Sequence, residues 1–368
     1  MPTEPEADIG PGNHNRASVF VGACAGLGRH ERQFRTKGSC LFRSAQPGDK
    51  GTGHEQRFMS VRVRVAGPQE VLMVKQGEFG GFFAEFYDIL HAGLGDVGAY
   101  VRYASRYCGP LKQLPGDGLP SDGLPSGTVS SGTPGIAKAG SSILELGSGT
   151  GRILIPLAAA GFHVTGVDNS DDMIALCKEK LNRESPSTQE RTRVIKGNVV
   201  DLDLGETFDL VIAPCNLLSC LTDRGEALSL LKTAKRHLQD NGVFILDCSI
   251  PDVRLMIESN GVTRTFEFTH PVTGTTIIDR FTPHYDFVNQ LETDHIVLEE
   301  RYGDTLLRRA ETTDTLAFYF PREVRLMLDS AGLRVFHEQG SVTEDIPLDE
   351  HAGEMVFFAR KAEPGRSG

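Results

Sequence analysis

Short apolar runs alternate with amphipathic segments between residues 142 and 250. The apolar runs predict buried strands at 143–146, 163–167, 193–196, 208–213 and 242–247, and apolar residues that recur every three or four positions predict helices at 152–160, 171–183 and 224–239. This alternation predicts a parallel sheet with helices on both faces. Such sheets bind ligands beyond the carboxyl ends of their strands, so we expect the functional site there.

The pattern changes after Pro251. A short helix ending at Glu258 precedes β-rich segments at 262–269, 275–287, 290–302 and 306–318, which predict an inserted antiparallel sheet. A helix at 321–331, ended by Gly332, and strands at 333–337 and 354–360 then complete the first sheet. We therefore predict an α/β core made of residues 142–250 and 319–361, with residues 251–318 as a β insertion.

Residues 73–108 are predicted to form a helical lid ahead of the core. Aromatic and aliphatic side chains recur at helical spacing from residue 78 to residue 94, and a second helix is predicted at 96–107. An aromatic stripe of this kind is also typical of core packing, and both interpretations stay open. Tyr87 and Asp88 carry polar groups on the first helix, which makes them candidates for contacts with a ligand.

Two segments lack the pattern of a folded core. Residues 1–72 are rich in Gly, Pro, Arg and Ser, so we expect a disordered or non-native extension, with Met59 or Met73 as the natural first residue. Residues 109–141 contain a short imperfect repeat of Leu, Pro, Gly, Ser and Asp. Such turn-forming residues cannot build a core, and they predict a linker.

Three alternate glycines follow the first predicted strand. Glycine can adopt positive φ and lets a ligand come close to the backbone. A dinucleotide motif has the spacing G-x-G-x-x-G, whereas this loop has G-x-G-x-G, with a glutamate two positions before it. That carboxylate would repel a pyrophosphate and attract the ammonium group of an amino acid. Unless it is a chance glycine-rich turn, the loop is predicted to bind a nucleoside that carries an amino acid, through Glu145, Gly147, Ser148, Gly149, Thr150, Gly151 and Arg152.

Asp168 ends the second predicted strand. A carboxylate at this point can accept hydrogen bonds from both hydroxyls of a ribose. The alternative is a role as the N-cap of the helix that starts at residue 171, which Asn169 or Ser170 could take instead. We therefore predict that Asp168 binds ribose.

The order of these motifs resembles that of class I S-adenosylmethionine-dependent methyltransferases, over roughly residues 78–361. The resemblance is to a small-molecule group with a β insertion after the fifth strand, to which the sugar N,N-dimethyltransferases of antibiotic pathways belong. It implies a Rossmann-like, doubly wound, mostly parallel sheet, with S-adenosylmethionine as the cofactor.

The resemblance also implies roles for residues outside the glycine loop. The family usually has Gly-Asp after the third strand to bind adenine, whereas this chain has Gly197-Asn198-Val199, whose amide oxygen would accept the bond more weakly. A tyrosine of the first helix closes over the cofactor and matches Tyr87, and Cys220 stands where those relatives have a histidine near the acceptor. The remaining cofactor site is predicted to comprise Asp168, Asn169, Met173, Gly197, Asn198, Val199, Pro214, Cys215 and Asn216.

Methyl transfer requires alignment of the acceptor, exclusion of water and, for a hydroxyl acceptor, removal of a proton. We therefore predict transfer to an oxygen or nitrogen of a small molecule, with Tyr87, His284 and Tyr285 as catalytic candidates. His284 and Tyr285 are adjacent in a predicted strand, so one of them faces inward. The alternatives are an NAD(P)-dependent oxidoreductase and a non-catalytic cofactor-binding or scaffold protein.

Composition narrows the partners. A net charge of −11 disfavours nucleic acid, and without an apolar run of about 18 residues no membrane span is expected. The seven cysteines show no C-x-x-C spacing, which indicates reduced thiols and a cytoplasmic protein. No group of residues has the spacing of metal ligands. A small-molecule substrate is expected, and a homodimer stays open.

Overall fold

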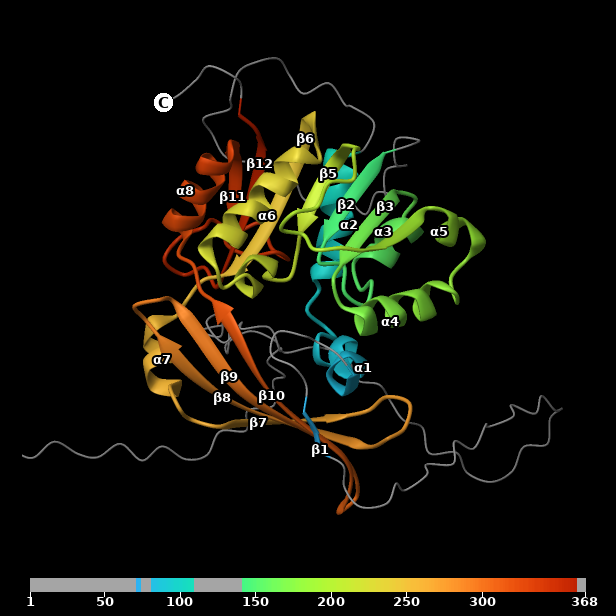
Figure 1. Ribbon diagram of the computed structural model, residues 1–368, viewed down its shortest axis with the longest axis vertical. Helices are drawn as coiled ribbons and strands as arrows, with labels where there is room; N and C mark the ends of the chain where they lie inside the picture. The colour runs from blue at the N-terminus through green and yellow to red at the C-terminus, as the bar shows by residue number, and fades with distance from the viewer. Residues whose placement is uncertain (1–70, 74–80, 109–140, 363–368) are drawn as a thin grey trace, which may run out of the picture.

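Two β-sheets, with helices between and around them, make up residues 71–73, 81–108 and 141–362, which are the residues that the computed structural model describes (Figure 1). Residues 1–70 of the predicted extension and residues 109–140 of the predicted linker lie outside this range. Among the described residues, no helix is long and apolar enough to cross a membrane.

The larger sheet has seven strands in the order β11-β12-β6-β5-β2-β3-β4. They are β2 (Ser142–Leu146), β3 (His163–Asp168), β4 (Thr192–Lys196), β5 (Phe208–Ala213), β6 (Leu238–Ser249), β11 (Leu333–Gln339) and β12 (Glu354–Lys361). Neighbouring strands are parallel except that β12 runs antiparallel to both β6 and β11. The predicted doubly wound, mostly parallel sheet is confirmed. The strand order reverses between β2 and β5, so their carboxyl ends border the crevice where such sheets bind ligands.

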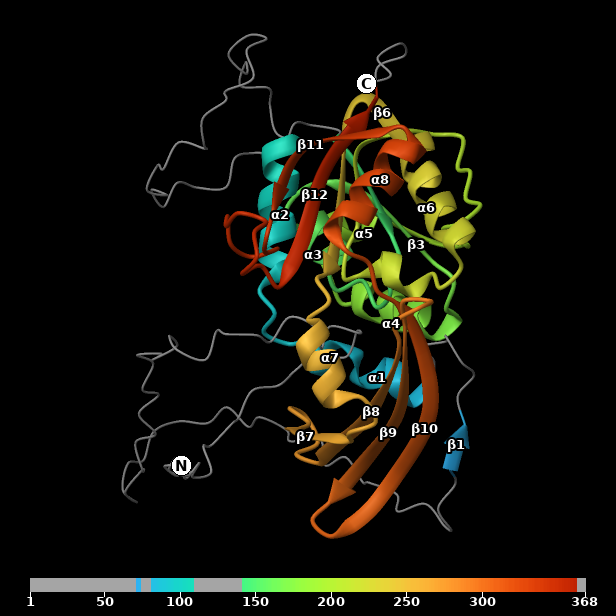
Figure 2. The ribbon, with the colours of Figure 1, turned by 90° about the vertical axis from the view of Figure 1, so that its left-hand side faces the viewer.

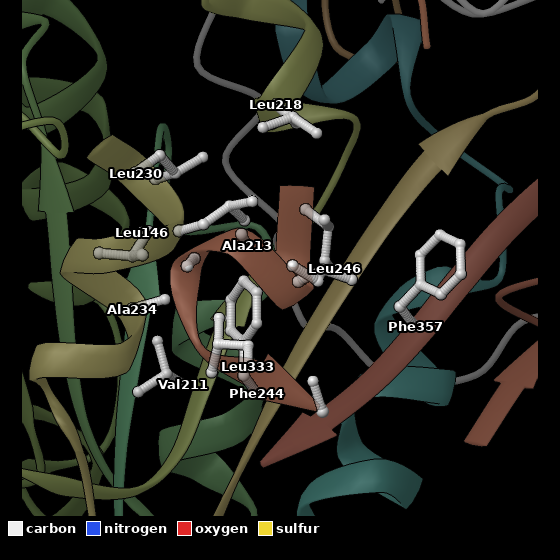
Figure 3. Close-up of a cluster of buried hydrophobic side chains, with 14 of the residues drawn as sticks. Leu146, Val211, Ala213, Leu218, Leu230, Ala234, Phe244, Leu246, Leu333 and Phe357 are labelled. Carbon is white, nitrogen blue, oxygen red and sulfur yellow. The ribbon is translucent and has the colours of Figure 1, made fainter. Parts of the chain in front are cut away.

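Helices cover both faces of this sheet, because alternate residues of its strands point to opposite sides. Ile143 packs in the buried cluster under α2 (Asp96–Tyr107) and α3 (Leu154–Ala159), whereas Leu144 packs in the cluster under α6 (Arg224–Arg236) and α8 (Pro321–Ala331). Figure 3 shows the second cluster, in which Leu230 of α6 lies among side chains of the sheet. Helices α4 (Asp171–Leu181) and α5 (Pro186–Glu190) contact β4.

The smaller sheet has five strands in the order β1-β10-β9-β8-β7. After α7 (Val253–Ser259), the chain forms β7 (Arg264–Thr269), β8 (Thr276–Asp286), β9 (Leu291–Tyr302) and β10 (Thr305–Ala317) as antiparallel neighbours, which confirms the predicted inserted sheet. β1 (Val71–Met73) adds to β10 in parallel. Val71 and Leu72, which the sequence assigned to the extension, therefore belong to this sheet.

Helix α1 (Gly81–Leu90) lies between the two sheets (Figures 1 and 2). Its buried side chains Phe82, Phe83 and Phe86 pack with Ile277 and Phe281 of the smaller sheet. The aromatic stripe is thus core packing, one of the two interpretations that the sequence left open. Because α1 packs on the smaller sheet, it forms one wall of the space between the sheets.

The sequence misplaced the boundary between α6 and β6 and did not predict α5. The helix predicted at 224–239 ends at Arg236, and β6 begins at Leu238 rather than at residue 242. Asn241 and Gly242 belong to β6 and lie at a bulge, since pairing passes from Phe208 with Leu238 to Leu210 with Val243. Helix α5 was not predicted, although Ser185 caps it and a proline stands in its first turn.

Candidate active site

The glycine loop after β2 adopts a conformation that requires glycine. Gly147, Gly149 and Gly151 have φ of 70°, 50° and 76°. A Cβ atom on Gly147 would lie 2.7 Å from Leu217 Cδ1, and one on Gly151 would lie 2.6 Å from Cys177 Sγ, whereas a Cβ on Gly149 would meet nothing within 4 Å. The outer glycines are therefore fixed by packing against the protein. Of the three glycines, only Gly149 has open space beside it. A ligand can therefore lie against the backbone at this residue.

Glu145 lies beneath this loop as a buried carboxyl group. Its Oε2 accepts no hydrogen bond from any described residue. Burial raises the pKa of this carboxyl well above its usual range, although the Arg152 guanidinium acts in the opposite direction. A buried polar atom without a partner is costly, and an ammonium donor would remove that cost. The predicted pairing of Glu145 with the amino group of a cofactor fits this arrangement.

Asp168 lies at the carboxyl end of β3 and connects the glycine loop to α4. Its Oδ2 accepts a hydrogen bond from Gly149 N at 2.7 Å, and its Oδ1 accepts one from Ser170 N at 2.9 Å. The N-cap of α4 is Ser170, whose hydroxyl accepts a bond from Met173 N, so Asp168 is not the cap. Each carboxylate oxygen keeps a further lone pair, which leaves Asp168 able to accept bonds from a ribose.

The two residues predicted to contact adenine lie in different surroundings in the turn after β4. Asn198 is exposed, and its side-chain oxygen accepts a hydrogen bond from Val200 N at 3.0 Å. Val199 is buried and packs in the core cluster beneath α6. Gly197 N donates to the carbonyl of Asp168 at 2.9 Å, which holds this turn beside the predicted ribose site.

Asp88 joins the lid helix α1 to the glycine loop. It accepts hydrogen bonds from Thr150 Oγ1 and from Lys180 Nζ of α4, both at 2.6 Å. Tyr87, the neighbouring residue, stacks on the ring of His91 with the centroids 3.9 Å apart. Burial raises the pKa of the Tyr87 hydroxyl. Arg152, and Cys215 and Cys220 after β5, lie close enough to act on this hydroxyl electrostatically. The structure therefore brings Tyr87 to the predicted site.

The loop after β5 is held in an unusual conformation by Asp247, at the end of β6. Cys215 and Asn216 both have φ of 60°, a left-handed conformation that costs about 1–2 kcal/mol per residue outside glycine. Asp247 Oδ1 accepts a bond from Cys215 N at 3.0 Å, and Oδ2 accepts one from Asn216 N at 3.1 Å. The Tyr100 hydroxyl also donates to Asp247. The carboxylate thus stabilises the strained backbone next to Pro214.

Arg152 links this loop to α2. Its guanidinium donates to both carboxylate oxygens of Asp96, at 2.7 and 2.6 Å, and to Cys215 Sγ at 2.8 Å. Burial raises the pKa of the Cys215 thiol well above its usual range despite the nearby Arg152. Cys215 therefore remains a neutral thiol rather than a thiolate nucleophile.

Sequence reasoning missed Asp96, Tyr100 and Asp247 as parts of this site. A signal was present for two of them, since Asp247 ends a predicted parallel strand and Asp96 begins a predicted helix. Tyr100 could not have been found, because its contact with Asp247 joins residues 147 positions apart.

Comparison with known proteins identifies the chemistry of this site. Residues 143–242 match a family model described as a methyltransferase domain. The chain is also 29% identical over 225 residues to the cypemycin N-terminal methyltransferase of a Streptomyces species, a match that covers 60% of this chain and 84% of that protein. The chain is an S-adenosylmethionine-dependent methyltransferase. The oxidoreductase and non-catalytic alternatives are therefore set aside.

Solved methyltransferase structures share the fold of this methyltransferase. The CcbJ methyltransferase from Streptomyces caelestis superposes with a TM-score of 0.52 and 26% identity, over 61% of this chain and 90% of that one. The sugar N-methyltransferase KedS8 from Streptoalloteichus sp ATCC 53650 superposes with a TM-score of 0.55 over 86% of this chain and 100% of that one. At 17% identity the second likeness shows the fold alone.

The two catalytic candidates in the inserted sheet face opposite sides, as the sequence predicted. Tyr285 lies on the side that faces α1, and its hydroxyl donates to Glu292 Oε1 at 2.9 Å. His284 is exposed and projects from the other side. The catalytic role predicted for His284 therefore has no support in its position, and Tyr285 is the member of the pair that faces inward.

Four acidic residues share the inner side of the inserted sheet with Tyr285. Asp294 lies directly opposite Asp314 in the β9–β10 pairing, Glu292 is two residues away on the same face, and Asp279 lies on this face of β8. Burial raises the pKa of Asp279 to about 8, that of Glu292 to about 8 and that of Asp294 to about 7, and neighbouring carboxylates add to each shift. Near pH 7 these groups retain protons that exposed carboxyls would have lost.

We expect these raised pKa values to make the enzyme less stable as the pH rises. Unfolded carboxyl groups titrate near pH 4, so between pH 4 and about 8 the unfolded chain releases protons that the folded protein keeps, and stability is lost over that window. Asp279→Asn removes one such group. Its melting temperature relative to wild type should rise steadily from pH 5 to pH 8, as measured by calorimetry. A constant difference across this range would contradict the assignment.

Proposed function

We propose that the methyltransferase transfers the methyl group of S-adenosylmethionine to an oxygen or nitrogen of a small molecule by in-line displacement. The observation that carries this proposal is that helix α1 covers the glycine loop. Asp88 of α1 accepts hydrogen bonds from Thr150 and Lys180, and α1 itself packs on the inserted sheet. A site covered on this side favours a small acceptor and excludes water from the reaction. A lone pair of the acceptor forms the new bond to carbon, the sulfur keeps the electrons of the broken bond, and the acceptor loses a proton.

We assign the cofactor to the residues that border the carboxyl ends of β2, β3, β4 and β5. In this assignment Glu145 faces the ammonium group of the cofactor, and the glycine loop lies against the cofactor at Gly149. Asp168 accepts hydrogen bonds from the ribose. The remaining contacts are assigned to the residues that flank these positions: Ser148, Thr150, Arg152, Asn169, Met173, Asn198, Val199, Pro214, Cys215 and Asn216. The orphaned Oε2 of Glu145 and the free lone pairs of Asp168 support this placement.

Tyr87 is assigned to the wall next to the reacting methyl group. The nearby Arg152 and Cys215 place its phenol beside the end of β5, where donor and acceptor should meet. Its raised pKa keeps the hydroxyl protonated near neutral pH, so it acts as a hydrogen-bond donor that positions the acceptor rather than as a base.

Tyr87→Phe should lower kcat by about tenfold or more and leave the melting temperature nearly unchanged, because one positioning hydrogen bond is lost while the ring and its packing remain. Steady-state kinetics and calorimetry provide the two measurements. Tyr302→Phe is the matched control, since this tyrosine is exposed on the β9–β10 hairpin. Wild-type kcat in Tyr87→Phe would return Tyr87 to a packing role.

The proposal as a whole is tested by incubating the enzyme with S-adenosylmethionine labelled in the methyl group and with panels of small amines, phenols and alcohols. Label should enter a small molecule, with one S-adenosylhomocysteine formed per label transferred. Transfer of label only to protein or nucleic acid, with the cofactor bound, would overturn the small-molecule acceptor.

A further inference from the structure

The inner face of the inserted sheet carries an acidic cluster for which the proposed methyl transfer gives no explanation. Asp279, Glu292, Asp294 and Asp314 are only 0%, 5%, 7% and 9% exposed. Side chains with full negative charge are rarely buried unless a cation accompanies them. None of the four forms an ion pair with a lysine or arginine of the described chain. Without a cation, the cluster avoids the cost of buried charge by keeping protons, so a cation that binds there would allow these groups to ionise.

Asp279 and Asp294 of this cluster have carboxyl oxygens without hydrogen-bond partners. Neither carboxyl oxygen of Asp279 has a hydrogen-bond partner within the described residues, and Oδ1 of Asp294 lacks one as well. The other two are partly satisfied, since Glu292 accepts a bond from the Tyr285 hydroxyl and Asp314 accepts one from Thr315 N. Buried acceptors that no described donor satisfies indicate that a donor from outside the described residues belongs there.

The acidic cluster begins where the proposed acceptor should lie. β10 packs against the short 3-10 helix Leu217–Cys220 that follows β5, and Asp314 of β10 and Asp168 both act electrostatically on Cys220. Glu292 lines a small cavity together with Asn216 and Ser219 of the loop after β5. The cluster thus extends from the end of β5, where the methyl group should be presented, along the inserted sheet.

We propose that this acidic cluster binds a protonated amine of the methyl acceptor, an inference that rests on the proposed function. An ammonium group has several N–H donors, which suits carboxylate oxygens that now lack partners. No group of His, Cys, Asp and Glu among the described residues has the arrangement of a metal site, so an organic cation fits better than a metal ion. The acceptor is accordingly a small basic molecule. Its ammonium group donates hydrogen bonds to Asp294 and Asp314, and Asp279 accepts a further one.

Cyclohexylamine and cyclohexanol form a matched pair of probes, because they share a ring and differ in charge at pH 7. Their dissociation constants are measured by calorimetry on the full chain, with and without S-adenosylhomocysteine. Cyclohexylamine should bind at least about tenfold more tightly than cyclohexanol, which corresponds to one charge-assisted hydrogen bond. Equal affinities for the two probes would overturn the proposal.

The double variant Asp294→Asn with Asp314→Asn should abolish this preference for the amine. It should fold, because neutral amides remove the repulsion between two buried carboxyl groups, and a circular dichroism spectrum checks this. Asp279→Asn, which should also weaken amine binding, is the second variant should the double one unfold. Glu267→Gln on the exposed side of β7 is the control and should keep the wild-type preference. Retention of the preference in a folded acidic-cluster variant would overturn the assignment.

The same measurements separate this inference from the proposed function. If S-adenosylhomocysteine binds but no amine preference is seen, the acidic cluster is not an acceptor site and the methyl transfer stands. If the amine preference is present and is lost in the variants, but labelled methyl groups never reach a small molecule, the cluster binds amines and the proposed reaction is wrong.

Discussion

Asp168→Ala should weaken S-adenosylmethionine binding by about a hundredfold or more. The variant loses a carboxylate that we assign to both ribose hydroxyls, and two charge-assisted hydrogen bonds at roughly 1.5 kcal/mol each account for that factor. It also frees Gly149 N, which Asp168 binds at 2.7 Å, so the glycine loop loses part of its support. Titration calorimetry with S-adenosylhomocysteine measures the affinity.

The fold of the Asp168 variant should remain intact, because the carboxylate lies at the edge of the sheet rather than within its core. Asp171→Ala is a suitable control: this aspartate lies nearby on α4, is exposed and pairs with Lys196. It should bind the cofactor as wild type does. Unchanged affinity in Asp168→Ala would remove Asp168 from the ribose-binding role.

Asp247→Ala should reduce both stability and activity. Without the carboxylate, the N–H groups of Cys215 and Asn216 lose their acceptors while both residues remain at φ of 60°. The Tyr100 hydroxyl loses its acceptor as well, and three donors left without a partner should lower the free energy of unfolding by about 3 kcal/mol. Relaxation of this loop should also lower kcat/KM by about a hundredfold, since small displacements of a reacting site have large effects. Urea unfolding and steady-state kinetics measure the two losses.

Asp209→Ala provides a matched comparison for Asp247→Ala. Asp209 stands at the opposite end of β5, where its Oδ2 accepts a hydrogen bond from Ser142 N at 2.9 Å. Its loss should lower stability by about 1 kcal/mol and leave kcat unchanged. If Asp247→Ala loses stability but keeps wild-type kcat/KM, the strained loop has no part in catalysis.

Local signals predicted the fold well wherever they agreed with its packing. Helix α8 was placed correctly because Pro321 starts it and Gly332, with φ of 75°, ends it. The end of α6 was misplaced because polar residues after Arg236 continue a helical pattern, whereas pairing of Leu238 with Phe208 extends β6 through them. Long-range pairing decided that boundary, and no local pattern carries it.

The candidate site divides in the same way. The glycine loop and Asp168 could be identified because each lies at the end of a strand that is visible in the sequence. The acidic cluster could not be, since Asp294 and Asp314 become neighbours only through the β9–β10 register. The outward position of His284 likewise depended on long-range contacts, since it follows from the pairing of β8 with β9 and from the packing of α1 on the opposite face. The sequence established only that one residue of the pair would face inward.

The pairing of β1 with β10 has a consequence for the order in which the molecule folds. It joins residues 71–73 to residues 309–311, with β1 beside β10 in Figure 2, and such non-local contacts form late because a long loop must first close. Strands β2 to β5 pair only with strands from the same part of the chain, but β6 also pairs with β12, and α6 packs against α8. During synthesis the chamber for the acceptor can therefore close only once β10 has emerged from the ribosome, and the cofactor sheet gains its last two strands later still.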